Sequence, residues 1–245
     1  MKVVSLVPSI TEALFDLGLT EKEIVGRTKF CIHPEEKIKN VAVIGGTKNI
    51  NIDKIKALQP DLILANKEEN IKEQVEALMD EHKVIVTNVE TIEDNYYLLK
   101  SLGKTFNKEE KAQLFNLKIY EILNQAKISS NVKVAYLIWK NPYMTIGSDT
   151  FIHKILTEIG FENIFKDKTR YPEIQTEDLA EADIIMLSSE PFPFKEKHIE
   201  ELREFYPEKK IMIVDGEAFS WYGTHIAKCE HYFKELIFEV KSIII

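Results

Sequence analysis

The sequence predicts an α/β fold made of two lobes with parallel sheets, joined by one long α-helix. Three observations lead to this prediction. Apolar segments of strand length alternate with amphipathic segments of helical length, segments of the first half recur in order in the second half, and a long helical segment lies between the halves. The chain of 245 residues is long enough for two lobes of about 100 to 120 residues each.

Seven segments have the composition of buried strands. Val, Ile and Leu occupy both faces of each, as in a parallel sheet that helices cover on both sides. They are "KVVSLV" (2–7), "EIVGRT" (23–28), "DLILA" (61–65), "KVIVT" (83–87), "KVAYLIW" (133–139), "DIIMLS" (183–188) and "KIMIVD" (210–215). Amphipathic stretches such as "SITEALFDLG" and "DTFIHKILTEIG" lie between them, so we expect Rossmann-like lobes.

Three pairs of segments indicate an internal duplication. Residues 2–18 parallel 133–160, residues 51–78 parallel 176–202, and "KVIVTNVE" parallels "KIMIVDGE". In this alignment Asp61 matches Asp183. Because the three matches occur in the same order, we interpret the chain as two copies of one α/β lobe.

A helix is predicted from about Lys108 to Ala126. The segment "KEEKAQLFNLKIYEILNQA" contains no Gly or Pro, and its apolar residues recur at helical spacing. We therefore divide the chain into an N-terminal lobe (1–104), a linking helix (105–129) and a C-terminal lobe (130–245).

The loops that follow the predicted strands are rich in aromatic residues. Ligands of open parallel sheets bind beyond the carboxyl ends of the strands. Loops are usually polar, so rings at these positions favour a ligand-binding surface, although packing into the local core is an alternative. The rings are Phe30, Trp139, Tyr143, Phe192, Phe194, Phe219, Trp221 and Tyr222. In the first loop, "PSIT", we expect Ser9 to cap the next helix.

Enzyme motifs are absent from the sequence. It contains no GxSxG, no P-loop and no GxGxxG motif, and we expect no catalytic residue and no intrinsic cofactor. His33, His153 and His225 each lie near a strand-end loop and could together bind a transition metal in a metal-dependent enzyme. Asp149 or Glu217 could join them. Solvated or capping histidines are the alternative.

Composition and charge exclude other classes of protein. The net charge is −8 and no basic stripe is present, so a nucleic-acid partner is not expected. No apolar run is long enough to cross a membrane. The start "MKVVSLVPS" lacks a signal peptide, so we expect a cytoplasmic protein if Met1 is the true start and a periplasmic or cell-surface protein if a leader was removed. Cys31 and Cys229 either form a disulfide or are two inert thiols.

The order of these segments resembles that of a known family. The matching stretches are "SLVPSITEALFDLG", "VGRTKFCIHP", "IGGTKNINIDKIKALQPDLILANKEEN", "WKNPYMTIGSDTFIHKILTEIGFENIF", "SSEPFPF" and "DGEAFSWYG". Over nearly its whole length the chain resembles the helical-backbone (class III) periplasmic binding proteins of ABC importers, most closely the vitamin B12-binding branch. The resemblance implies a monomer without catalytic activity that holds a bulky metal chelate in a cleft between its lobes.

The resemblance also implies a set of ligand-binding residues. In the first lobe they are Pro8, Ser9, Ile10, Arg27, Phe30, Gly46, Asn66 and Lys67. In the second lobe they are Trp139, Tyr143, Met144, Glu190, Phe192, Phe219, Ser220, Trp221 and Tyr222. Family members dock arginines of the permease through one acidic residue on each lobe. The first of these positions falls beside Lys72, so Glu73 is the nearest acidic residue, and Glu196 matches the second.

The residue types favour a corrinoid among the ligands of the family. Rings and apolar side chains suit the flat face of a cobalamin-like macrocycle, and Asn66 and Ser220 could meet its amide arms. A trianionic siderophore would need several cations, but the nearby cations are balanced by acidic residues. A ferric siderophore, haem, or a cytoplasmic role as a corrinoid binder or sensor are the alternatives.

Overall fold

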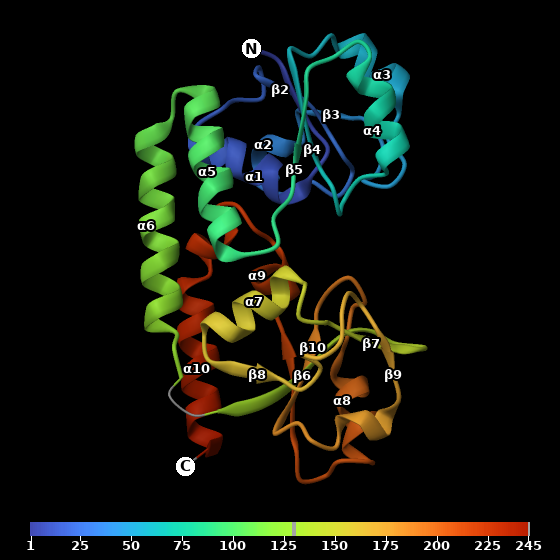
Figure 1. Ribbon diagram of the computed structural model, residues 1–245, viewed down its shortest axis with the longest axis vertical. Coiled ribbons are helices and arrows are strands. Elements are labelled where there is room, and N and C mark those ends of the chain that lie inside the picture. Colours follow the sequence, from blue (N-terminus) through green and yellow to red (C-terminus); the bar gives the residue numbers. More distant parts are fainter. Residues whose placement is uncertain (129–130, 245) are drawn as a thin grey trace. The chain divides into compact units, whose positions relative to one another are not determined.

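The computed structural model describes residues 1–128 and 131–244, and they form two compact α/β units (Figure 1). Unit 1 comprises Met1–Val89, Glu93–Lys118 and Trp221–His225, and unit 2 comprises Glu90–Ile92, Ile119–Ser220 and Ile226–Ile245. The predicted fold class is confirmed. The predicted boundaries at 104 and 129 stay a prediction.

Unit 1 contains a five-stranded parallel sheet in the order β3-β2-β1-β4-β5. The strands are β1 (Val3–Ser5), β2 (Ile24–Arg27), β3 (Ala42–Val43), β4 (Leu62–Asn66) and β5 (Val84–Thr87). The helices are α1 (Pro8–Leu17), α2 (Glu35–Ile38), α3 (Ile52–Leu58), α4 (Lys72–Met79) and most of α5 (Ile92–Phe106). Helices α1 and α2 lie on one side of the sheet and α3 and α4 on the other (Figure 1).

Unit 2 contains a mixed sheet in the order β11-β10-β6-β7-β9, with β8 paired to β6. The strands are β6 (Val132–Trp139), β7 (Tyr143–Thr145), β8 (Phe161–Asn163), β9 (Glu173–Ile174), β10 (Ile184–Ser188) and β11 (Lys210–Val214). The helical elements are α7 (Phe151–Glu158), η1 (Thr176–Leu179), α8 (Glu196–Arg203), α9 (Gly216–Ser220), η2 (His225–Lys228) and α10 (Glu230–Ile244). Of these, His225 at the start of η2 belongs to unit 1.

An inserted hairpin makes the second sheet mixed rather than purely parallel. Strand β7 runs antiparallel to β6, and β9 runs antiparallel to β7. The turn between β6 and β7 places Asn141 at φ 64°, a left-handed conformation that asparagine adopts more readily than most residues. The second copy of the repeat therefore carries an insertion at the end of its first strand.

The internal duplication is visible in the hydrogen bonds of both sheets. In unit 1, β1 pairs with β4 and β4 with β5, and in unit 2, β6 pairs with β10 and β10 with β11. The backbone N–H of Lys2 donates to the carboxylate of Asp61 (2.6 Å), and the N–H of Lys133 donates to Asp183 (2.8 Å). The backbone N–H groups of the same two aspartates donate in turn to the carbonyls of Lys2 and Lys133. The aspartates that match in sequence therefore make the same reciprocal contact.

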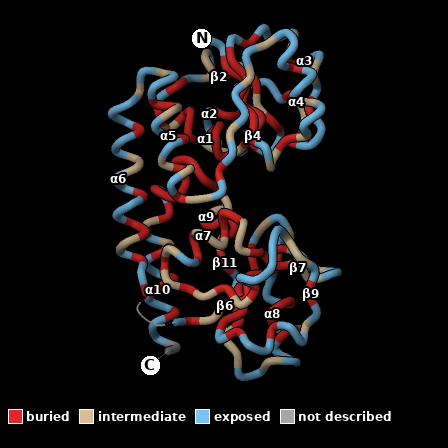
Figure 2. The backbone as a smooth tube through the Cα atoms, in the orientation of Figure 1, coloured by how far each residue is buried: buried red, intermediate tan, exposed pale blue. Residues whose placement is uncertain are grey.

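The long helix predicted from 108 to 126 is present as α6 (Glu109–Gln125). The division between the units falls within it, after Lys118. Its N-terminal part has several exposed apolar side chains, whereas Ile119, Ile122 and Leu123 are buried (Figure 2). Among the described residues, no helix is both long and apolar enough to cross a membrane.

The expectation that Ser9 caps α1 is wrong. Val7 occupies the N-cap position without a side-chain hydrogen bond, and the helix begins at Pro8. Proline suits a first helical position because its φ is already helical and it has no N–H to leave unpaired. Ser9 is therefore inside the first turn, and it is buried.

Candidate ligand-binding surfaces

The loops after the strands of unit 1 carry the first set of predicted residues. Phe30 is 49% exposed and lies against Gly46, where an added Cβ would approach the ring at 3.3 Å. The ammonium of Lys29 lies 4.9 Å from the centre of the Phe30 ring. Glycine at position 46 thus lets the backbone approach an aromatic ring that remains exposed to solvent.

Two of the predicted polar residues are engaged within the loops. Asn66 is buried, its carbonyl accepts from the N–H groups of Glu68 (2.8 Å) and Glu69 (3.2 Å), and its amide donates to Thr87. The guanidinium of Arg27 donates to the carbonyls of Thr28 and Ile38. These contacts give both side chains a role in holding the loops.

The other predicted residues of this half differ in exposure. Pro8 is half-buried, Ile10 is fully buried in the core, and Lys67 is exposed. Of these three residues, Pro8 and Lys67 therefore have accessible surface that a ligand could contact.

Segment 221–225, which is the sequence Trp-Tyr-Gly-Thr-His, belongs to unit 1 although the sequence places it in the C-terminal lobe. Trp221 lies edge-on to His33, with ring centres 5.2 Å apart, and His225 is stacked 6.0 Å from His33. Both Trp221 and His225 are more than nine-tenths buried, whereas His33 is half-buried. Tyr222 is also buried, and its desolvation raises the pKa of the phenol well above its usual value.

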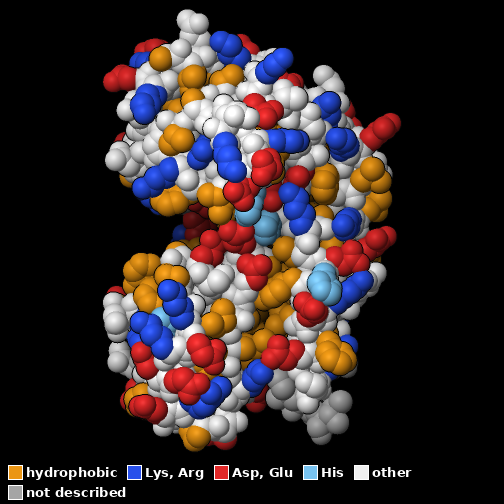
Figure 3. Space-filling view, turned by 180° about the vertical axis from the view of Figure 1, so that it is seen from behind, with side chains coloured by type: hydrophobic (Ala, Val, Ile, Leu, Met, Phe, Trp, Pro, Cys, Tyr) orange, Lys and Arg blue, Asp and Glu red, His pale blue; other side chains and the backbone are white. Residues whose placement is uncertain are grey.

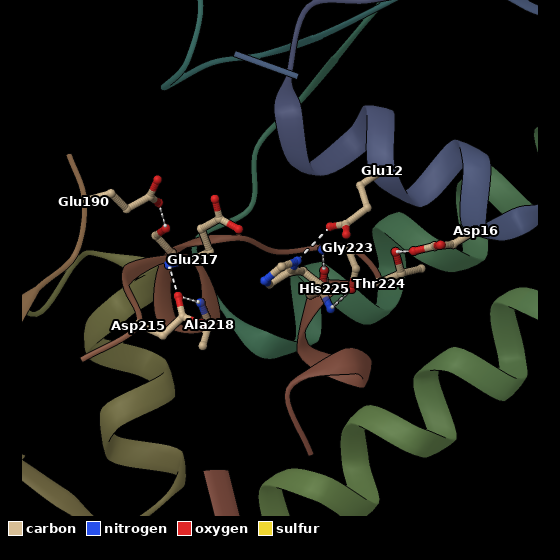
Figure 4. A network of polar contacts seen from close by, with 11 residues as sticks. Glu12, Asp16, Glu190, Asp215, Glu217, Ala218, Gly223, Thr224 and His225 are labelled. Atoms are coloured by element: carbon tan, nitrogen blue, oxygen red, sulfur yellow. Dashed lines mark hydrogen bonds and ion pairs between the residues drawn. The ribbon is translucent and has the colours of Figure 1, made fainter. Parts of the chain in front are cut away.

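Helix α1 provides acidic partners for this segment. The imidazole Nδ1 of His225 lies 2.8 Å from a carboxylate oxygen of Glu12, and the hydroxyl of Thr224 donates to Asp16 (2.5 Å). Figure 4 shows both carboxylates pointing from α1 toward the segment. The sequence analysis did not identify Glu12 or Asp16, because no local pattern relates them to residues more than 200 positions away.

In unit 2, the rings that follow β6 and β10 are partly exposed. Trp139 is 40% exposed and lies edge-on to Phe192, with ring centres 5.6 Å apart. Phe192 packs in turn on Phe194, which is buried. Tyr143 and Met144, on β7, are half-buried. The hydroxyl of Tyr143 is protonated at neutral pH, as in any ordinary tyrosine, and can donate a hydrogen bond; burial raises its pKa further.

Glu190 and Ser220 are brought together in unit 2. The hydroxyl of Ser220 donates to a carboxylate oxygen of Glu190 (2.7 Å). Nearby, Ser189 accepts from the N–H of Gly216, and the carboxylate of Asp215 accepts from the N–H of Glu217. These polar groups follow β10 and β11, at the end of the sheet where a ligand is expected.

Phe219 packs in the core of unit 2, although the sequence analysis placed it on the ligand surface. It has no exposed surface, and its ring makes edge-on contacts with Tyr136 (5.3 Å) and Phe233 (5.6 Å). The structure therefore supports the core alternative for this ring.

His153 lies apart from the predicted ligand-binding residues. It lines an open cavity of about 640 Å³ in unit 2 with Ser148, Asn163 and other residues, none of which is in the predicted set. Its Nδ1 lies 3.3 Å from the amide of Asn163, and burial lowers its pKa.

In the described part of the chain, no group of three or more His, Cys, Asp or Glu side chains is arranged to hold a metal ion. Cys31 and Cys229 are both buried and are not joined in a disulfide.

Glu73 and Glu196 occupy equivalent places in the two units. Glu73 lies in the first turn of α4, which follows β4, and Glu196 begins α8, which follows β10. Both carboxylates are exposed, and acidic groups in a first helical turn interact favourably with the helix dipole. Figure 3 shows that cationic and anionic side chains are interspersed over the face it draws.

Two duplicated α/β units with exposed rings and polar groups at the ends of their strands are the architecture of a bilobal ligand-binding protein. The chain belongs to the periplasmic binding protein family, whose model matches residues 3–204.

Sequence similarity to named binding proteins supports the same family assignment. The chain is 32% identical over 184 residues to the vitamin B12-binding protein of Salmonella typhimurium, covering 72% of this chain and 67% of the relative. It is 30% identical over 189 residues to an ABC transporter substrate-binding lipoprotein of Bacillus subtilis, covering 72% of this chain. The match spans 59% of the length of that lipoprotein.

Solved structures share the fold. The periplasmic vitamin B12 binding protein of Vibrio cholerae superposes with a TM-score of 0.83 at 18% identity, over 98% of this chain and 97% of that one. A periplasmic haem-binding protein from Roseiflexus sp. RS-1 superposes with a TM-score of 0.81 at 15% identity, over 97% and 98%. At these identities the likeness is one of fold alone. The predicted family is confirmed.

Proposed function

We propose that the protein binds a bulky metal chelate, specifically a cobalamin-like corrinoid, and delivers it to an ABC permease. The observation that carries the proposal is the exposure of Phe30, in the loop after β2, and of Trp139, the last residue of β6, at 49% and 40%. Large rings left in water at such positions suit a flat apolar ligand, because burying them on binding releases the hydrating water.

The polar groups beside these rings favour a neutral ligand over an anionic one. Lys140 is already paired with Glu201, and Arg27 donates to backbone carbonyls. The hydroxyl of Ser220 and the protonated hydroxyl of Tyr143 can meet amide groups of a corrinoid. The relatives named as vitamin B12-binding proteins support the same choice.

The proposed delivery step uses Glu73 and Glu196 as docking residues. Their equivalent positions on α4 and α8 would present one carboxylate from each unit to cations of a permease. The relatives named as periplasmic or lipoprotein binding proteins support a periplasmic or cell-surface location. We propose that the protein acts there as a monomer and performs no chemistry on its ligand.

A ligand screen tests the proposal. The purified protein is mixed with cobalamin, cobinamide, haem and ferric siderophores, and the shift in melting temperature and the Kd are measured for each. We expect cobalamin or cobinamide to give the largest shift. Haem or a siderophore as the only ligand would replace the corrinoid assignment, and no response to any of the four would remove the proposed ligand class.

A further inference from the structure

Segment 221–225 is a short piece of chain that packs into unit 1 from a distant part of the sequence. The chain enters this segment from α9 of unit 2. After His225 it returns to unit 2 at Ile226, within η2. Its middle residue, Gly223, has φ +77°, and a Cβ there would lie 3.1 Å from the carbonyl oxygen of Ser9 and 3.2 Å from the Cβ of Ala13. The segment thus lies directly on α1, in a conformation that favours glycine.

Three side chains of unit 1 bind this segment, and two of them, Asn95 and Glu12, are buried. The amide of Asn95, on α5, accepts from the N–H of Gly223 (2.5 Å) and donates to its carbonyl (3.2 Å). Asp16 accepts from the hydroxyl of Thr224, and Glu12 pairs with His225. Asn95 and Glu12 are 0% and 2% exposed, so each is hydrogen-bonded away from water.

These contacts fix the position of Trp221. Trp221 lies two positions before Gly223, the first anchored residue, and its indole packs on His33 and His225 in the same unit. A carboxylate as buried as that of Glu12 is costly unless it is paired, so the pairing of Glu12 with His225 strongly favours the docked segment. Together, the contacts anchor residues 223–225, which begin two positions after the indole.

We propose that Glu12, Asp16 and Asn95 are positioning residues that hold Trp221 in place for the ligand. The inference rests on the proposed function and extends it, because it places Trp221, a member of the ligand-binding set expected from the sequence, at the corrinoid. If one contact is lost, only a fraction of molecules keeps the segment docked, and the apparent Kd rises by the inverse of that fraction. None of the three residues needs to touch the ligand.

Fluorescence of Trp221 tests the docking without any ligand. Trp221 and Trp139 are the two tryptophans of the chain, so a Trp139→Phe background leaves Trp221 as the reporter. In this background, Glu12→Ala and Asn95→Ala should shift the emission to longer wavelength and increase quenching by acrylamide. Glu12→Gln keeps a hydrogen-bond acceptor for His225, so its emission wavelength and its quenching by acrylamide should remain closer to those of the parent.

For ligand binding, the same substitutions at Glu12 and Asn95 are made in the wild-type chain, which keeps Trp139, and the variants are titrated with cobinamide and cobalamin. We expect Glu12→Ala and Asn95→Ala to raise the Kd by about tenfold, as for a docked fraction of about one tenth, and Glu12→Gln to raise it less. Ile55→Ala is the control, because it opens a cavity in the core of unit 1 on α3 and should lower the melting temperature with no change in the emission of Trp221. All measurements are made well below the melting temperatures.

The outcomes separate the positioning role from the proposed function. Unchanged emission and quenching in Glu12→Ala and Asn95→Ala would overturn the positioning role. Changed emission with unchanged Kd would overturn its link to the ligand, as would an equal rise in Kd for Ile55→Ala. Failure of the wild-type protein to bind any corrinoid would overturn the proposed function and that link, while the fluorescence of the unliganded variants would still decide whether Glu12 and Asn95 hold Trp221.

Discussion

At the scale of single residues, neighbouring aromatic residues have different roles. Phe219 is fully buried among Tyr136 and Phe233, whereas Trp139 is 40% exposed beside Phe192. The sequence analysis assigned both to the ligand because both follow strands. Local sequence does not show which way a ring points, since that depends on helices packed from elsewhere in the chain.

Alanine substitutions should separate these two roles. Phe219→Ala should lower the free energy of unfolding by about 3–5 kcal/mol, because it leaves a cavity in the core of unit 2. Trp139→Ala should change stability by less than about 1 kcal/mol but weaken corrinoid binding by about 1–3 kcal/mol. Urea unfolding and calorimetric titration measure the two effects, and an unchanged Kd in Trp139→Ala would contradict a ligand-contacting role for the indole.

His198 should make the stability of the protein depend on pH. Its Nδ1 accepts from the N–H of Lys195 at the start of α8 (2.8 Å), which requires that nitrogen to be unprotonated. Burial lowers the pKa of His198, and Lys140 and Lys197 lower it further. The unfolded chain therefore binds a proton more readily, so this contribution is complete above about pH 6.5 and is lost as the pH falls toward the folded pKa.

Replacement of His198 by glutamine isolates this effect. The wild type should lose more stability on acidification than His198→Gln, by at most about 1.4 kcal/mol per pH unit, and the two pH dependences should become parallel above about pH 7.5. Urea unfolding between pH 5 and 8 makes the comparison. The control is His231→Gln, because His231 is exposed on α10. Parallel profiles for wild type and His198→Gln throughout would exclude a role for this imidazole.

At the scale of secondary-structure elements, the duplicated strands were predictable and the short ones were not. All seven predicted strands are present, because runs of Val, Ile and Leu favour strands of a parallel sheet, but β5 is not buried as expected, since Ile85 and Val86 are exposed. The missed strands β3, β7, β8 and β9 have two or three residues each, too few to show a periodicity. The placement of segment 221–225 was missed because contacts between residues some 200 positions apart leave no local pattern.

The matched aspartates should contribute equally to the two units. Asp61→Ala and Asp183→Ala should each lower the free energy of unfolding by about 0.5–1.5 kcal/mol, because each removes the acceptor of one backbone N–H at the start of a central strand. Asp80→Ala is a suitable control, because Asp80 lies at the C-terminal end of α4, where a negative charge is unfavourable. A large loss for one aspartate and none for the other would show that the duplicated contact is not energetically equivalent.

At the scale of the whole molecule, charge distinguishes the possible ligands. The chain carries 40 acidic and 32 basic residues, a formal net charge of −8, which repels an anionic ligand at long range. An anionic siderophore would need local cations to overcome this repulsion, but Lys140 is paired with Glu201 and Arg27 is bonded to carbonyls. A neutral corrinoid needs no such cations.

Binding of a corrinoid should therefore depend little on salt. We expect the Kd of cobalamin to change by less than about twofold between 0.05 and 0.5 M NaCl, because added salt screens interactions between charged groups but not apolar contacts. A trianionic siderophore held by Lys67 and Arg27 would bind more weakly as salt screens those charges. Lys67→Ala is informative for the same reason, since it should leave the Kd of cobalamin nearly unchanged but weaken a siderophore. Strongly salt-dependent binding of a ferric siderophore, with none for cobalamin or cobinamide, would identify an anionic ligand and leave the two-unit fold as described.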